Sequence, residues 1–280
     1  MKRQHDHQVL SSLALFLDNR ILTSGEAFFN HQSRFYPATS QYSGRRTYSL
    51  PFKQLVNDSS VSGATVMTSV QISGVPVTVG SSGLLSINHY QGTVDFDTSY
   101  PNYPASSMSG SFAVKEINIY TTADNDEKLL FYTKFQRNPQ TPQSVTGLGT
   151  SVYTLPAIFL KKRGGENKPF SLGSVDESVI DIRAFVITDN DYLRDGVVSI
   201  LKDTHYRRFS FISPPFDAEQ AYVGVDYNYS GLSSAASGTY FGPLIQGVLE
   251  SRLSRNSSDG SLDDLKITVV DFEISQVRSH

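Results

Sequence analysis

The stretch VMTSVQISGVPVTV, residues 66–79, decides the fold class of this chain. Apolar or β-branched residues hold every second position from Val66 to Ile72 and again from Val75 to Val79, with Ser73 and Gly74 between the runs. A period of two places successive side chains on opposite faces of a strand, and a glycine-containing pair between two such runs is typical of a hairpin. The stretch therefore predicts two antiparallel strands.

The same period continues on the C-terminal side of this hairpin. Residues 84–96 contain a second strand pair around a glycine turn, and residues 112–135 contain a third. Short strands at this spacing, separated by turn residues, are typical of an antiparallel sandwich or small barrel. We expect an antiparallel β-sandwich or barrel domain at residues 48–136, with no helix longer than two turns inside it.

The N-terminal segment carries a helical period instead. Apolar residues at three- and four-residue steps describe one face of an amphipathic helix: Leu10, Leu13, Leu17 and Ile21. We expect this face to be buried against a strand at residues 180–187 or to serve as a contact with a neighbouring subunit.

Beyond a proline-containing boundary at residues 138–142, strand and helix patterns alternate. The expected elements are a strand at 157–161, a basic turn at 162–168, a strand at 180–187, a helix at 191–201 and a final strand at 265–274. Residues 213–260 show no period and are expected to form a loop-like excursion. The predicted fold class is α+β and β-dominated, with the domain at 48–136 inserted into an α/β domain made of residues 1–47 and 137–280.

The composition excludes several classes of protein. The chain is 39% apolar and 18% charged, has a formal net charge of −3 and contains no cysteine. A slightly acidic molecule has no overall attraction for nucleic acid or anionic lipid, and disulfide or thiolate chemistry is excluded. No stretch approaches the ~20 apolar residues that span a bilayer. We expect no membrane partner.

Motifs of catalysis and metal binding are missing or incomplete. The phosphate-binding loop, the dinucleotide-binding glycine motif and the nucleophile elbow are all absent, so we expect neither an enzyme nor a cofactor. His5 and His7 supply too few ligands for a closed metal site. Asp189, Asp191 and Asp195 superficially resemble a calcium loop, but their spacing is wrong, and helix capping explains them better.

Four basic residues surround a glycine pair in the expected turn: Lys161, Lys162, Arg163 and Lys168. Clustered cations beside glycine suit close approach to phosphate, so a loop facing DNA is one interpretation. A solvated hairpin tip is the other. In a ring the same loop would be repeated by every copy and could line the lumen.

Tyrosines crowd one C-terminal segment: Tyr222, Tyr227, Tyr229 and Tyr240. Tyrosine faces stack on sugars, but tyrosine is also enriched at subunit interfaces. Sequence alone leaves both interpretations open.

One segment resembles a hairpin of phage virion proteins. The string LLSINHYQGTVDF at residues 84–96, followed by SFAVK at residues 111–115, is similar to a β-hairpin found in neck and tail proteins of tailed bacteriophages. It consists of a strand, an aromatic-x-Gly turn, a V-x-F strand and a further strand after a loop.

A broader resemblance connects the flanking segments to tail-terminator proteins. The N-terminal helix, the strands at 156–160 and 180–186, the acid-capped helix at 191–201 and the final strand are similar to the α/β framework of that family. Those proteins form rings that cap the tail tube and join it to the head. The chain departs from the family by its greater length and by the β-sandwich inserted after the first helix.

The resemblance implies a virion structural protein that assembles in the host cytoplasm as a homo-oligomeric ring, of which a hexamer is one form. Its expected partners are neighbouring neck and tail proteins and the genomic DNA that passes through the lumen. Terminator, stopper, adaptor and baseplate positions all remain open. The alternative function is a receptor-binding or glycan-binding β module of a tail fibre or baseplate.

Overall fold

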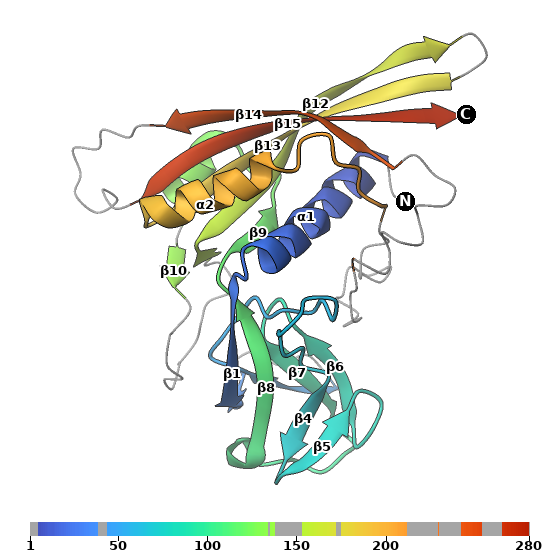
Figure 1. Ribbon diagram of the computed structural model, residues 1–280. Helices are drawn as coiled ribbons and strands as arrows, with labels where there is room; N and C mark the ends of the chain where they lie inside the picture. Colours follow the sequence, from blue (N-terminus) through green and yellow to red (C-terminus); the bar gives the residue numbers. More distant parts are fainter. Residues whose placement is uncertain are drawn as a thin grey trace.

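A computed structural model describes residues 5–38, 44–133, 135–137, 153–171, 175–211, 229, 242–253 and 265–279. It confirms the predicted α+β, β-rich class. The described residues form an α/β unit around one long sheet and a β unit below it (Figure 1).

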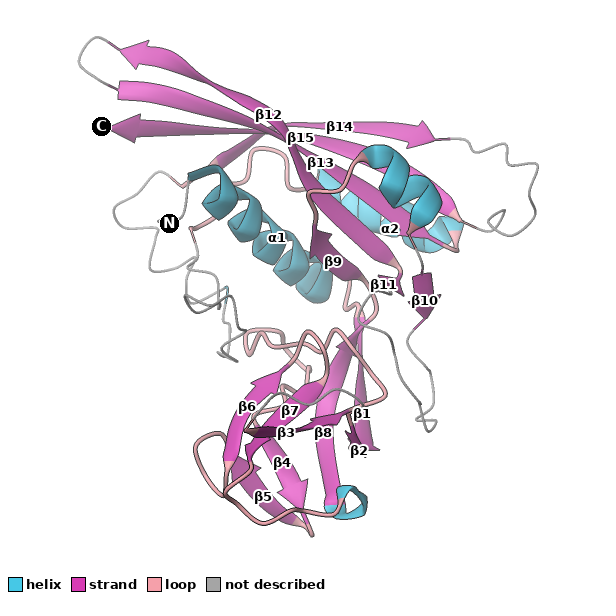
Figure 2. Ribbon diagram, turned by 180° about the vertical axis from the view of Figure 1, so that it is seen from behind, coloured by secondary structure: helices cyan, strands magenta, loops and turns pink. Residues whose placement is uncertain are grey.

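The α/β unit is built on a five-stranded sheet with the order β14-β15-β13-β12-β9. Only the β9–β12 pair is parallel. The helices α1 (His5–Ser24) and α2 (Asp191–Lys202) lie on one face of this sheet (Figures 1 and 2). The strands are β9 (Asn118–Thr121), β12 (Ala157–Ser171), β13 (Val175–Thr188), β14 (Leu244–Leu253) and β15 (Lys266–Ser279).

The predicted apolar face of α1 packs against the sheet. Leu13, Leu17 and Ile21 are buried in one cluster with Ile182 and Val270, which point to the same face from the two central strands. Leu10 is partly buried at the edge of this cluster. The expected burial against the strand at 180–187 is therefore confirmed, and burial of the helix face within the chain supplies the core of this unit.

On the opposite face of the sheet, the described residues cover one end. A π-helical turn, η2 (Lys128–Tyr132), and the short parallel pair β10 (Phe135–Arg137) and β11 (Tyr153–Leu155) lie over it. Phe159 and Phe185 are buried beneath them.

The β unit contains two four-stranded sheets, β1-β8-β4-β5 and β2-β3-β7-β6, whose facing sides share one core. Phe52, Phe96 and Phe112 are fully buried in it. The predicted hairpins appear as β4–β5 and β6–β7. The strands are β1 (Phe28–Arg34), β2 (Tyr36–Pro37), β3 (Arg45–Ser49), β4 (Ser69–Ile72), β5 (Val75–Thr78), β6 (Leu84–Asn88), β7 (Thr93–Asp97) and β8 (Met108–Lys115).

The boundaries between the two units differ from the predicted boundaries at residues 48 and 136. The strand β1 pairs with β8 inside the β unit, whereas β9 pairs with β12 in the α/β unit. The chain changes core between them, because Phe112 is buried in the β unit and Ile117 in the α/β unit. The expected third hairpin is therefore wrong. Two helical segments fall inside the span, η1 (Ala105–Ser107) and η2, and neither is longer than two turns.

Two C-terminal expectations are also wrong. The basic turn at 162–168 is instead part of β12, which runs beside β13 as far as Ser171. The glycine pair marks an irregularity in the strand: the register shifts between Lys162 and Gly164, and a Cβ on Gly165 would lie 2.8 Å from a carbonyl oxygen of β13. Part of the expected loop at 213–260 is the strand β14, and most of the rest lies outside the described residues.

Candidate functional site

The long sheet continues past its outer strands as a three-stranded extension. We call residues 162–171 of β12, 175–181 of β13 and 276–279 of β15 the sheet arm. Beyond Leu160 the outer side of β12 has no neighbouring strand among the described residues, and beyond Ser275 the same holds for β15. The far end of the sheet arm extends past the N-terminal end of α1 (Figures 1 and 2).

The sheet arm exposes apolar as well as polar side chains. Every residue from 165 to 170 on β12 is exposed. Phe170 keeps 59% of its surface accessible and Val277 keeps 41%. An open strand edge with exposed apolar side chains is a surface suited to contact with another chain.

The four basic residues named from the sequence lie on or next to this arm, and each has a carboxylate partner. The pairs are Lys161–Asp126 at 2.8 Å, Lys162–Asp6, Arg163–Asp271 at 3.6 Å and Lys168–Glu166 at 2.6 Å. Glu166 holds the pKa of Lys168 above its ordinary value through a hydrogen bond and its charge. Partners inside the chain reduce the attraction that these cations exert on phosphate.

Arg183 stands at the centre of this charged group. Its guanidinium donates to both carboxylate oxygens of Asp271, at 2.7 and 2.8 Å, and lies 3.5 Å from Asp126. The hydrogen bond to Asp271 is the main cause that raises its pKa. In the sheet register Lys161, Arg183 and Asp271 are directly opposite one another on three adjacent strands. The row therefore ties the strands together where the sheet arm begins.

The helix residues that were predicted to contact a neighbouring subunit lie mostly inside the core of this chain. Leu13 and Leu17 have no accessible surface, and Ile21 retains 1%. Such side chains have no surface left for a second subunit, and only Leu10 remains partly accessible.

The metal and glycan interpretations have no described site. Among the described residues, no three His, Asp or Glu side chains gather as metal ligands would. Asp191 and Asp195 instead form ion pairs with Arg194. Tyr229 is buried and packs against Phe16, so its ring is not exposed to a sugar. The other three tyrosines of that group lie outside the described residues.

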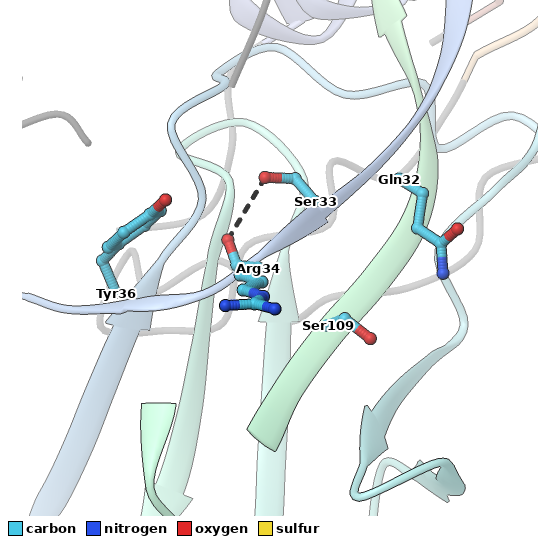
Figure 3. A pocket seen from close by; sticks show the side chains of 5 residues that line it. All are labelled: Gln32, Ser33, Arg34, Tyr36 and Ser109. Atoms are coloured by element: carbon cyan, nitrogen blue, oxygen red, sulfur yellow. Dashed lines mark hydrogen bonds between the residues drawn. The ribbon is translucent and has the colours of Figure 1, made fainter. Parts of the chain in front are cut away.

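A shallow groove in the β unit was not expected from the sequence. It has a volume of about 460 Å³ and is lined by Gln32, Ser33, Arg34, Tyr36 and Ser109 (Figure 3). The lining residues come from the end of β1, the start of β2 and the start of β8. No sequence motif marks them, because the groove arises where the chain passes from one sheet to the other.

The chain matches no protein-family model, and no curated protein matches it at a significant level. No helix among the described residues is both long enough and apolar enough to cross a membrane.

Proposed function

We propose that this chain is a structural subunit of a tailed-phage virion that forms an oligomeric ring at the neck or the tail interface and acts by assembly rather than catalysis. The sheet arm carries this proposal. The arm is the end of three strands of 14 or 15 residues, far longer than the five or six residues of an average strand. It has open edges among the described residues, and it extends past the N-terminal end of α1 (Figure 1).

An isolated subunit gains little from an ordered arm of this kind. Ordering each backbone residue costs about 1–2 kcal/mol, and an exposed strand recovers little of that cost by burial. Contact with the next subunit would recover it. A contact in which the arm of one copy meets a different surface of the next is heterologous. Repeated contacts of that type close into a ring when the rotation between neighbours closes, and otherwise build an open filament; the proposal is the closed case.

The sequence resemblance favours a terminator-like position and leaves stopper, adaptor and baseplate positions open. A sheet with two helices on one face, of which α1 is the N-terminal helix, and a β unit that follows α1 in the chain support a terminator-like subunit with an added domain. The partners in this proposal are copies of the chain and neighbouring neck or tail proteins. Passage of DNA through the ring stays a prediction of the same proposal.

The test is to replace the exposed apolar residues of the arm in the full chain. Phe170→Asp combined with Val277→Asp should shift the protein from its assembled state to monomer in sedimentation velocity, because charge is costly in an apolar contact. Tyr192→Asp is the matched control, since Tyr192 is 84% exposed on α2 away from the arm. Retained assembly in the double variant, with an unchanged melting curve, would overturn the role of the arm.

A further inference from the structure

The free edge of β1 lies beside the groove lined by Arg34 and Tyr36. Among the described residues β1 pairs only with β8. The hydrogen bonds of β8 show which residues of β1 direct their backbone groups away from β8. The N–H of Ala113 donates to the carbonyl of Thr65, and the N–H of Lys115 donates to the carbonyl of Gln54. Both acceptors lie on the side of β8 that faces away from β1.

Residues opposite each other in an antiparallel pair either exchange both hydrogen bonds or both point away. Ala113 is opposite Asn30, so Asn30 directs its own N–H and C=O outward, and the alternation repeats at Gln32 and Arg34. Gln32 has no backbone partner among the described residues. The carbonyl of Arg34 accepts one hydrogen bond, from the Ser33 hydroxyl at 3.3 Å, and keeps its second lone pair (Figure 3).

The groove also holds an unpaired positive charge. Arg34 is exposed, and no described carboxylate lies within ion-pairing distance of its guanidinium. The neighbouring arginines of β3 are engaged: Arg45 lies 3.9 Å from Asp95, and Arg46 donates to backbone carbonyls of Thr98 and Tyr100. Of the three described arginines of β1 and β3, Arg34 is thus the one that is available to a ligand.

We propose that this edge and groove bind an extended peptide segment of a partner protein, which adds a strand to β1 and places an acidic side chain against Arg34. Outward backbone groups at Asn30, Gln32 and Arg34 supply the ladder, and side chains of an added strand point alternately toward and away from the groove. A guanidinium binds a carboxylate through two parallel hydrogen bonds, which gives the site its preference for Asp or Glu. The inference is independent of the ring proposal, because the site lies in the β unit.

The test starts from a displayed library of random peptides of about eight residues, longer than an average strand. Selection on the immobilised full chain should enrich peptides that contain an Asp or Glu. The same peptides should lack proline at every second position, where their N–H groups bond the edge of β1. The leading peptide is then synthesised with a fluorescent label and titrated by anisotropy, together with a copy in which its acid is replaced by the amide.

Three variants of the full chain separate the contributions. Arg34→Glu should weaken binding of the acidic peptide by about tenfold or more. It should weaken binding of the amide copy much less, because the amide carries no charge to pair with Arg34. Gln32→Pro removes an outward N–H and should also weaken both peptides, while an edge strand tolerates the proline. Arg207→Glu is the matched control, since Arg207 is another exposed arginine without a described carboxylate partner, and it should leave affinity unchanged.

Equal binding by Arg34→Glu and Arg207→Glu, or a library that enriches nothing above the empty support, would overturn the proposal. Self-association that Gln32→Pro abolishes would assign the edge to a second copy and would also overturn it. A melting curve for each variant shows that it is folded. The variant with Phe170→Asp and Val277→Asp should bind the peptide as the parent does, which separates this site from the sheet arm.

Discussion

The ammonium group of Lys115 lies 2.6 Å from Oδ2 of Asp18, and both side chains are largely buried. Lys115 ends β8 in the β unit, whereas Asp18 lies on α1 in the α/β unit. Beside this pair, Asn19 donates a hydrogen bond to Asp58 at 2.7 Å. The polar side of α1 therefore holds the two units together, while its apolar side forms the core of its own unit.

Replacing Lys115 with Met should lower the free energy of unfolding by about 3 kcal/mol, because it leaves the buried carboxylate of Asp18 without its partner. Urea denaturation measures the change. Lys128→Met is the control, because the pair that Lys128 forms with Asp124 is largely exposed, and that change should have little effect. In the double variant with Asp18→Leu, most of the loss should be restored. A single variant as stable as the parent would show that the pair does not hold the units together.

Arg183→Gln should destabilise the protein by about 1–3 kcal/mol, because Asp271 loses both charge-assisted hydrogen bonds from Arg183. The Arg183 side chain is only 20% exposed, so water replaces these bonds poorly. The control is Arg252→Gln, since Arg252 is 62% exposed and its ion pairs lie at the surface. Thermal unfolding of both variants decides the matter. Equal effects would mean that the charged row contributes no more than a surface pair.

The two neighbouring glycines of β12 should respond differently to alanine. A Cβ on Gly165 would lie 2.8 Å from the carbonyl oxygen of Val179, whereas a Cβ on Gly164 would have its nearest contact at 3.9 Å. Gly165→Ala should therefore cost about 1–3 kcal/mol and Gly164→Ala much less. Urea denaturation of the two variants in parallel provides the comparison. A larger loss for Gly164→Ala would contradict the register of β12 against β13.

Glu116 offers a test by pH. Burial raises the pKa of its carboxyl in the folded protein, so the charged form is penalised by folding. The penalty is present above the folded pKa and disappears as the pH falls below the unfolded value. Glu116→Gln should raise the melting temperature near neutral pH and have no such effect in acid. A difference between variant and parent that does not change with pH would contradict this assignment.

The sequence predicts local elements well and the pairing of distant strands poorly. Alternation at residues 66–79 and 84–96 was sufficient to find β4–β5 and β6–β7, because both hairpins close over a few residues. The spacing of Leu13, Leu17 and Ile21 likewise identified α1 and its buried face. These patterns are visible because each depends only on neighbours along the chain.

The boundary between the units could not be found in this way. The strand β9 joins the α/β unit by pairing with β12, and the phase of Asn118 against Ala157 has no local signature. The glycine pair at 164–165 suggested a turn, but glycine also suits a strand irregularity, and only the close approach of β13 distinguishes the two.

The candidate sites show the same limit. The sequence identified the cluster of cations at 161–168, but their partners Asp126 and Asp271 are far away along the chain and come close only through the sheet. Arg34 carried no signal at all. Its availability to a ligand depends on the register of β1 against β8, which turns the backbone groups of Arg34 outward. It also depends on the lack of a nearby carboxylate among the described residues.

The most direct test of the central claim is the mass of the purified full chain by native mass spectrometry over a range of concentrations. The account predicts one discrete closed oligomer that persists on dilution, with ring-shaped particles in electron micrographs of the same sample. An open series of oligomers of increasing size would contradict closure of the ring. A monomer at every concentration, with the sheet arm intact, would contradict assembly from copies of this chain.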